Sequence, residues 1–247
     1  YINKIFLTSV ITLAGMLGAT SCTDYLDKSP YSDIEENDPY KNFKNFQGFT
    51  EELYNCIPVV SNSEYHTSFN FGEEDYWEPQ ELRLFARNID YGDFWGWTTC
   101  YYSYPSSIRG GKANSQERSD KGNLWKLCWY GIRKANIGIA NLGNLVSATE
   151  EERNLIEGQL YFFRGWFHFM LMEWWGGMPY VDQVLPPDVA PALSRLTWQE
   201  CAEKCVADFD HAIPLLPVDW DQTTAGRATL GLNDTRINKI MALAYKG

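Results

Sequence analysis

Histidine is scarce in this sequence, since its 247 residues include three, His66, His168 and His211. None of the three stands in a motif with a serine or a cysteine, so nothing indicates a nucleophilic catalytic triad. Phosphate-binding and dinucleotide-binding loops are absent as well, because the stretch RGGKANS at 109–115 has neither a preceding strand nor the required glycine spacing. We therefore predict no catalytic residue and no cofactor.

Positive charge is also in short supply. The sequence has 21 Lys and Arg against 32 Asp and Glu, which gives a net charge of -11 at pH 7. Such a surface repels phosphate backbones and anionic headgroups, so nucleic acid is excluded as a predicted partner. Hydrophobic residues make up 45% of the chain. That proportion is enough to bury a sizeable core in one large domain or two small ones.

The apolar run near the start of the sequence is short for a membrane span. Residues 5–17 are largely apolar and follow Lys4, but these thirteen residues fall below the roughly 20 that a transmembrane helix needs. A basic residue, a short apolar core and then small residues are typical of a secretory signal peptide. We therefore expect residues 1–21 to direct export of the chain.

Cys22 follows three small residues, Ala19, Thr20 and Ser21. This order resembles the box at which bacterial signal peptidase cuts before a cysteine that then carries lipid, although a leucine is usual where Ala19 stands. Several acyl chains, palmitate among them, hold a protein on a bilayer where one chain is marginal. We expect lipidation at Cys22 and a mature domain of residues 22–247, with an ordinary signal peptide as the alternative.

The five other cysteines cannot all pair with one another. Two of them stand four residues apart on an expected helix, a spacing that suits a metal, yet His211 is the one histidine nearby and no second pair follows. We therefore predict buried, unpaired thiols and no metal site. The five are Cys56, Cys100, Cys128, Cys201 and Cys205.

Apolar residues at steps of three or four predict the first two helices. The first covers 42–57 and stops at Pro58. The second covers 124–146, about six turns by the usual rise of a helix. Its apolar stripe consists of Leu124, Cys128, Ile132, Ala135, Ile139, Leu142 and Val146.

A third helix is predicted to begin at a capping box formed by Thr149 and Glu152 and to run to Trp174, where two glycines stop it. Its connection to the preceding helix is short, so the two should be antiparallel neighbours. Gly158 and Gly165, seven residues apart, should let the backbones of these two helices approach closely. The pair therefore predicts a packed helical hairpin.

Two further helices follow. Thr197 and Glu200 form a second capping box, and Pro214 ends the helix that it starts; another helix begins near Asn233. Stacked hairpins of this kind resemble tetratricopeptide repeats, although no 34-residue motif recurs cleanly. The apolar stripe of the helix after Thr197 is Trp198, Cys201, Cys205, Phe209 and Ile213. In the last helix the residues spaced for burial are Ile237, Ile240, Met241, Ala244 and Tyr245.

Aromatic residues fall into two groups. Those with helical spacing should pack in the core, namely Trp125, Trp129, Phe163, Phe167, Trp174 and Trp175. Those at 70–106 have no stable period and stand among acids and turn formers, so they predict long structured loops between the first two helices. This second group is Tyr76, Trp77, Phe94, Trp95, Trp97, Tyr101, Tyr102 and Tyr104.

Several stretches, taken in their order along the chain, carry a family resemblance. They are TDYLDKSP after Cys22, FGEEDYW, WYGIRKANIGIANL, EGQLYFFRGWFHFMLMEWWGGMPYV, LSRLTWQECAEKCVADFDHAIPLLP and GRATLGLNDTRINKIMALAYKG. Together they resemble the SusD and RagB family of outer-membrane nutrient-binding lipoproteins of Bacteroidetes. The most specific of them has an arginine among aromatics, here Arg164, followed by a Gly-Gly-x-Pro turn at 176–179.

The resemblance implies an all-α fold, with tetratricopeptide-like antiparallel hairpins supporting a long irregular N-terminal section. It implies a lipid-anchored, surface-exposed protein of the outer membrane that acts as a lid on a TonB-dependent transporter of the SusC type. Family members are usually much longer, so the resemblance also implies that this chain is an N-terminal fragment. The function that it implies is capture of oligosaccharide or polysaccharide.

The loop-rich section contains the predicted ligand site. Flat aromatics bury the C–H faces of sugars while fixed polar groups bond the hydroxyls, and family members commonly contact glycans from this section. Trp95 and Trp97 are the predicted platforms, with core packing of the loops as the alternative for each ring. The remaining predicted ligand residues are Arg83, Arg87, Asp93 and Tyr101.

Two other functions compete with glycan capture. A glycoside hydrolase needs two carboxylates that face each other about 5 to 10 Å apart, and the acids of 73–81 supply candidates but are typical of a solvated loop. A helical adaptor would bind protein alone and make no use of the aromatic loop. Peptide cargo also stays open, because aromatic loops accept several amphipathic ligands.

Overall fold

The structure, a computed structural model, describes residues 38–57, 124–186 and 193–247. These residues form helices, with no strand among them and one isolated bridge between Asn42 and Ser147. The prediction of an all-α fold is confirmed for this part of the chain, whereas the irregular section expected within 58–123 lies outside it. The described elements are η1 (Asp38–Tyr40), α3 (Phe43–Asn55), α6 (Leu124–Ala140), η4 (Leu142–Asn144), α7 (Glu150–Trp175), α8 (Trp198–Ala212), η6 (Trp220–Gln222), α9 (Thr224–Arg227) and α10 (Lys239–Lys246).

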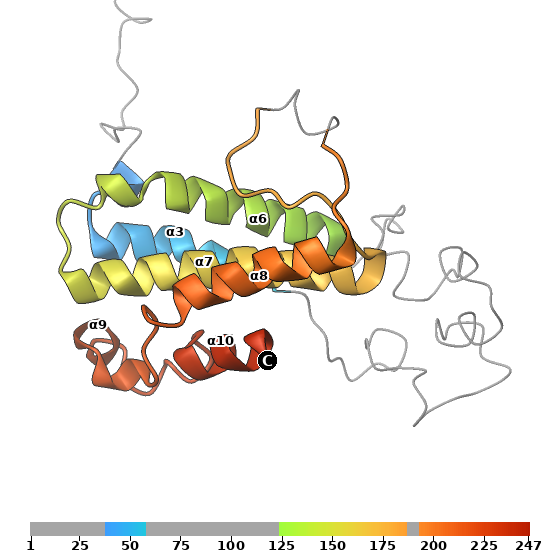
Figure 1. Ribbon diagram of the computed structural model, residues 1–247. Helices are drawn as coiled ribbons and strands as arrows, with labels where there is room; N and C mark the ends of the chain where they lie inside the picture. The colour runs from blue at the N-terminus through green and yellow to red at the C-terminus, as the bar shows by residue number, and fades with distance from the viewer. Residues whose placement is uncertain (1–37, 58–123, 187–192) are drawn as a thin grey trace, which may run out of the picture. The chain divides into compact units, whose positions relative to one another are not determined.

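Helix α7 is the centre of the described helices. It packs against α3, α6 and α8, and α10 packs on α8 (Figure 1). The consecutive long helices run in opposite directions, so α6 with α7 and α7 with α8 form the predicted antiparallel hairpins. All seven residues at 162–168 are buried. A helix needs apolar side chains on every face when neighbours surround it, which explains why this stretch is aromatic almost throughout.

Helix α3 confirms the first predicted helix. The Asn42 side chain accepts a hydrogen bond from the Asn45 backbone N–H at 3.0 Å and so caps the helix start. Phe46 and Leu53 are fully buried, which fixes the face that meets α6 and α7. The helix ends at Asn55, two residues earlier than the periodicity predicts.

Helix α6 is shorter than predicted. It ends at Ala140, a 3-10 turn follows, and Val146 is 73% exposed although it continues the apolar spacing. The Asn141 amide donates to the Ile137 carbonyl at 2.9 Å and its oxygen accepts from Asn144 at 2.8 Å. Such short polar side chains compete with the helical backbone bonds and end the helix. The spacing of apolar residues alone does not predict this end of the helix.

The glycines of α7 serve a different contact from the one predicted. A Cβ built at Gly165 would lie 3.0 Å from the Asp208 Cβ on α8, and Gly158 faces the residues that follow α8. Close approach of α6 to α7 comes instead from two glycines on α6, Gly131 and Gly138, where a Cβ would overlap side chains of α7. Gly165 therefore admits α8 and Gly158 admits the residues after α8, because α7 has neighbours on opposite faces.

Both predicted capping boxes are confirmed. At the start of α7, the Thr149 hydroxyl accepts from the Glu152 N–H at 3.2 Å and the Glu152 carboxylate accepts from the Thr149 N–H at 2.8 Å. Thr197 and Glu200 form the same pair of bonds at the start of α8, at 3.2 and 2.8 Å. Each box satisfies two backbone donors that the helix cannot pair internally.

Replacing Thr149 with alanine should therefore lower the free energy of unfolding by about 1 kcal/mol, because a helix loses its side-chain cap. Chemical denaturation followed by circular dichroism measures the change. Thr149→Ser is the matched control, since serine keeps the hydroxyl, and it should stay within about 0.5 kcal/mol of the parent. Equal losses in the two variants would show that the cap bond is not the cause.

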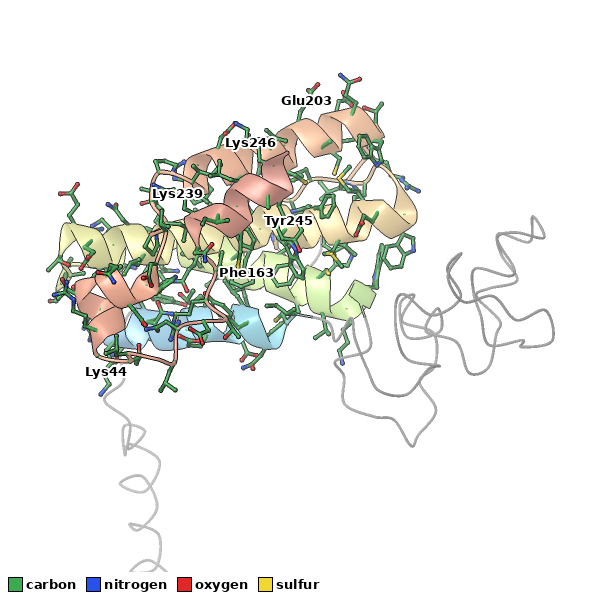
Figure 2. The ribbon with its side chains drawn as sticks, turned by 90° about the horizontal axis from the view of Figure 1, so that it is seen from below. Lys44, Phe163, Glu203, Lys239, Tyr245 and Lys246 are labelled. Carbon is green, nitrogen blue, oxygen red and sulfur yellow. The ribbon has the colours of Figure 1, made fainter. Side chains whose placement is uncertain are left out.

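Some residues of the apolar stripes predicted for α8 and α10 are exposed. Trp198, at the first position of α8, is 59% exposed because it stands at the end of the helix, and Ile240 on α10 is 58% exposed. The side chain of Ala244 is also exposed. Tyr245 is partly exposed, yet its ring packs on rings of α7 and α8 at centroid distances of 5.8 to 6.2 Å (labelled in Figure 2). One face of α10 thus meets the bundle, and the other does not.

Within the described residues, no helix combines the length and the apolar composition that a bilayer crossing requires.

Candidate functional site

The predicted ligand residues Arg83, Arg87, Asp93, Trp95, Trp97 and Tyr101 all lie outside the described residues, and so does Cys22. The structure does describe the helix ends on either side of the aromatic segment. Helices α3 and α6 pack together there, with the Tyr130 hydroxyl 3.3 Å from the Glu52 carboxylate. Figure 1 shows that α3 ends, α6 begins and α7 ends at the same end of the bundle.

Three tryptophans gather at this end of the bundle. The Trp125 ring meets Trp175 edge to face at a centroid distance of 4.9 Å, and Trp129 meets Trp125 at 5.6 Å. The prediction of core packing is wrong for Trp125, which is 37% exposed although its ring contacts two other tryptophans. Phe163 and Phe167 are fully buried as predicted. The Trp129 Nε1 atom is buried without a hydrogen-bond partner among the described residues.

A buried ion pair joins α7 to α8. The Arg164 guanidinium donates from Nε to Asp208 Oδ2 at 2.7 Å and from Nη2 to Asp208 Oδ1 at 2.6 Å. Both side chains are less than one tenth exposed. This two-bond geometry matches the flat guanidinium to the carboxylate, which makes it a strong form of ion pair. A charged residue inside the aromatic α7 is therefore neutralised by a charge on the neighbouring helix.

The same arginine reaches two further elements. Its Nη1 donates to the Asn136 side chain on α6 at 3.2 Å and to the Asp182 backbone oxygen at 3.1 Å. The Tyr180 hydroxyl adds a bond to Asp208 at 2.5 Å. One buried cluster thus fixes α6, α7, α8 and the segment after α7 to one another. We call that segment, Gly176–Pro186, the strap.

The strap begins at the Gly-Gly-x-Pro turn. Gly176 has φ +73, a backbone conformation that glycine adopts without cost, and it lets the chain reverse at the end of α7. A Cβ at Gly177 would lie 2.2 Å from the Leu196 carbonyl oxygen, so the strap passes directly against the start of α8. Arg195 donates to the Gly177 carbonyl at 2.7 Å and fixes the crossing.

His168 connects α7 to the middle of the strap. It is fully buried, and its Nδ1 lies 2.8 Å from the Arg164 carbonyl oxygen. Since a carbonyl oxygen only accepts, Nδ1 carries the proton and Nε2 is the acceptor for the Val181 backbone N–H at 3.0 Å. The Tyr180 ring stacks on the imidazole at 3.8 Å. Both nitrogens of a neutral histidine are thus in use.

The pKa values of the cluster follow from burial and from the ion pair. Burial disfavours the charged form of Arg164, but the hydrogen bonds and charge of Asp208 outweigh it, and the pKa of Arg164 is raised. Burial, then the charge of Asp208, raises the pKa of Tyr180, so this hydroxyl stays protonated and donates. Burial lowers the pKa of His168 to about 3. The cluster therefore keeps a fixed charge pattern at neutral pH.

The role of this cluster is to hold α6, α7, α8 and the strap in position. Its polar atoms are bonded to one another, so none is free to attack or protonate a substrate. Across the described ranges, no three His, Cys, Asp or Glu side chains gather to hold a metal ion. Cys56, Cys128, Cys201 and Cys205 are buried free thiols, as predicted, while Cys100 lies outside these ranges.

A shallow hollow of about 340 Å³ lies beside the start of α7, lined in part by Glu150, Glu151, Leu155 and Leu216. The carboxylates stand at the positive end of the helix dipole, where acids are stabilising. Glu151 also accepts from the Thr224 backbone N–H at 3.0 Å. Stability of the α7 start accounts for this acid pair without a ligand.

Sequence reasoning did not find the cluster around Arg164. Arg164 stood out as part of a family motif, but its partners Asp208, Asn136 and Tyr180 were not singled out. A usable signal was present, because Asp208 falls next to Phe209 on the apolar stripe of α8. A carboxylate at a core position and an arginine in an aromatic helix each need a partner of opposite charge.

Comparison with known proteins gives a family match, one curated relative and similar solved structures. The sequence profile of a SusD-like family, described as starch-binding and associating with the outer membrane, matches residues 24–230. A curated relative, SusD-like protein P2 of Formosa agariphila, is 31% identical over 95 residues, which is 38% of this chain and 19% of that protein. Both matches agree with the resemblance drawn from the motifs.

Two solved structures share the fold. A SusD-like protein of Bacteroides fragilis aligns with a TM-score of 0.58 at 18% identity, over 89% of this chain and 36% of that one. Surface glycan-binding protein A of Bacteroides fluxus aligns with a TM-score of 0.50 at 15% identity, over 83% and 39%. This chain therefore spans less than two fifths of the length of either structure.

Proposed function

The chain belongs to the SusD-like family, and from this premise we propose that it captures glycans at the cell surface without transforming them. The match over residues 24–230 carries the proposal, because it spans most of the chain and the family is described by starch binding. The likeness in fold to a surface glycan-binding protein of Bacteroides fluxus supports it. The cargo that we propose is an oligosaccharide or polysaccharide.

The proposed binding surface comprises Trp95, Trp97 and Tyr101, with Arg83, Arg87 and Asp93 as polar partners. Flat rings cover the C–H face of a sugar, and nearby polar groups bond its hydroxyls. What the described structure adds is a rigid base. The segment that carries these residues follows α3 and precedes α6 in the chain, and the buried ion pair between α7 and α8 helps to hold together the helices that α3 and α6 pack against.

The proposed setting is the outer membrane. Residues 1–21 serve as a signal peptide, Cys22 carries the lipid anchor, and 22–247 form the helical domain of a longer lipoprotein. The bound glycan passes to a SusC-like TonB-dependent transporter. The family description, which names association with the outer membrane, supports this location.

Replacing Trp95 and Trp97 together with alanine should weaken glycan binding by roughly 30-fold, because each stacked ring contributes on the order of 1 kcal/mol. Isothermal calorimetry on the full chain, with the glycan chosen from an array, measures the change. Trp198→Ala is the matched control, since Trp198 is an exposed tryptophan on α8 that we place outside the site. It should leave affinity unchanged.

The same experiment separates the competing functions. Unaltered affinity in the double variant removes Trp95 and Trp97 from the site while leaving glycan capture in place. Absence of binding to any glycan favours a helical adaptor that contacts protein alone. Recovery of shortened sugars favours a hydrolase instead, because a capture protein returns its ligand intact.

A further inference from the structure

The contact between His168 and the strap depends on the protonation state of one buried side chain. Imidazole is fully buried there, and both of its nitrogens are bonded to backbone groups that require the neutral form. A second proton on Nε2 would point at the Val181 N–H, so donor would face donor. Protonated histidine is therefore incompatible with the closed position of Val181.

The charged groups around His168 do not offset this conflict. Arg164, one turn earlier on α7, and Lys204 on α8 are both cations that disfavour an imidazolium. Asp208 on α8 is the acid of the cluster, but Arg164 and the Tyr180 hydroxyl occupy its two oxygens. Tyr180 covers one face of the imidazole as a neutral ring. Within the described residues, no carboxylate bonds to His168.

The remaining neighbours are apolar or distant from the ring nitrogens. From α6, the Trp129 ring meets the imidazole edge to face at 6.1 Å. Asp182 on the strap is exposed, and its carboxylate lies 3.9 Å from the Lys204 ammonium. In the closed state no negative charge among the residues that the structure describes is placed to stabilise a protonated His168. The strap must move and let water in before the imidazole can be protonated.

We propose that mild acid loosens the strap through His168. As the pH falls, the part around Tyr180 and Val181 opens more often, because opening exposes the imidazole and lets it take up a proton. The device is local, since the Gly177 and Leu185 carbonyls at the two ends of the strap are held by Arg195 and Arg133 through bonds that do not involve the histidine. The inference does not depend on the ligand that the protein binds.

The direction of the pH effect follows from linkage. Burial lowers the pKa of His168 from an ordinary value of 6.5 to about 3 in the closed state. A group with a lowered pKa for its cationic form stabilises the closed state fully above pH 6.5 and loses that contribution as the pH falls toward 3. The opening constant should therefore rise about tenfold for each pH unit in this window.

Hydrogen exchange of the Val181 amide tests the proposal, because this N–H donates to His168 Nε2. After correction for the intrinsic exchange rate, its protection factor should fall about 30-fold between pH 7.5 and pH 5. It should also be smaller than the protection of amides in the centre of α7, since the strap opens without global unfolding.

Two variants make the test specific. His168→Gln has no group that titrates in this range, so the pH dependence of Val181 should disappear. His211→Gln is the matched control, because His211 is exposed on α8 and pairs with Glu157 at 2.7 Å. It should leave the pH dependence intact. Should the His168 variant fail to fold, the parent chain still gives the pH profile.

Two results would overturn the proposal. The first is a Val181 protection factor that does not change between pH 7.5 and pH 5. The second is Val181 exchange that matches the most protected amides of α7 at both pH values, which would mean that the histidine responds only to global unfolding.

Discussion

Asp208→Ala should lower the free energy of unfolding by about 3 to 5 kcal/mol, the largest loss that we expect from a single side chain of the cluster. The substitution leaves the Arg164 guanidinium buried without its counter-charge, and it also removes the acceptor of the Tyr180 hydroxyl. An unpaired buried charge costs far more than the ion pair contributes, because the charge cannot recover its water. Urea denaturation followed by circular dichroism measures the loss.

Asp210→Ala is the matched control for this prediction. Asp210 lies two residues further along α8 and pairs with Lys246 at 2.6 Å, but that pair is about half exposed. Exposed ion pairs contribute about 0 to 1 kcal/mol, so this variant should stay close to the parent. Similar losses in the two variants would mean that burial of the Arg164 pair does not set its importance.

A double variant separates the charge from the packing. Arg164→Met together with Asp208→Leu removes both charges, so no unpaired ion remains. Its loss should be smaller than that of Asp208→Ala alone, since apolar side chains of similar size often replace a buried pair at little cost. A loss equal to the sum of the two single variants would contradict the role of the ion pair.

Gly177→Ala should lower the free energy of unfolding by about 3 kcal/mol and loosen the start of α8. A Cβ at this position would lie 2.2 Å from the Leu196 oxygen, 2.6 Å from the Thr197 carbonyl carbon and 2.7 Å from the Trp198 nitrogen. These are backbone atoms that no rotamer change can move, so the strap and α8 must separate. The capping box of α8 is built on the displaced Thr197.

Gly48→Ala provides the contrast, because Gly48 lies inside α3 with no atom within 4 Å of its added Cβ. Alanine there should raise stability by up to about 1 kcal/mol through helix propensity. Chemical denaturation of both variants compares the two glycines directly. If Gly177→Ala were as harmless as Gly48→Ala, the close crossing of strap and α8 would be wrong.

Local signals predicted the helices well. The capping boxes at Thr149 and Thr197 and the stop at Gly176 are interactions within four residues, so the sequence contains both partners of each bond. Apolar spacing likewise located α3, α7 and α8. Two helix limits were predicted wrongly. Helix α6 ends at Ala140 rather than at Val146, where a side-chain bond from Asn141 competes with the helix, and α10 begins at Lys239 rather than near Asn233.

Contacts between distant residues could not be read from spacing. Arg164 and Asp208 are 44 residues apart, and which helix an aromatic face meets depends on how several helices pack at once. The two glycines of α7 illustrate the point, since their spacing indicated a close approach but not the partners, which are α8 for Gly165 and the residues after α8 for Gly158. The proposed ligand residues at 83–101 stay a prediction, because they lie outside the described part of the chain.

The sequence by itself determined the helical class of the described residues, the starts of α3, α7 and α8, and the family. Each of these depends on residue type or on neighbours within a turn or two. The tertiary structure alone decided that Arg164, His168 and Asp208 form one buried cluster that holds the strap against three helices. The physical reason is that a buried charge or a neutral imidazole is defined by what surrounds it, and those surroundings come together when the chain folds.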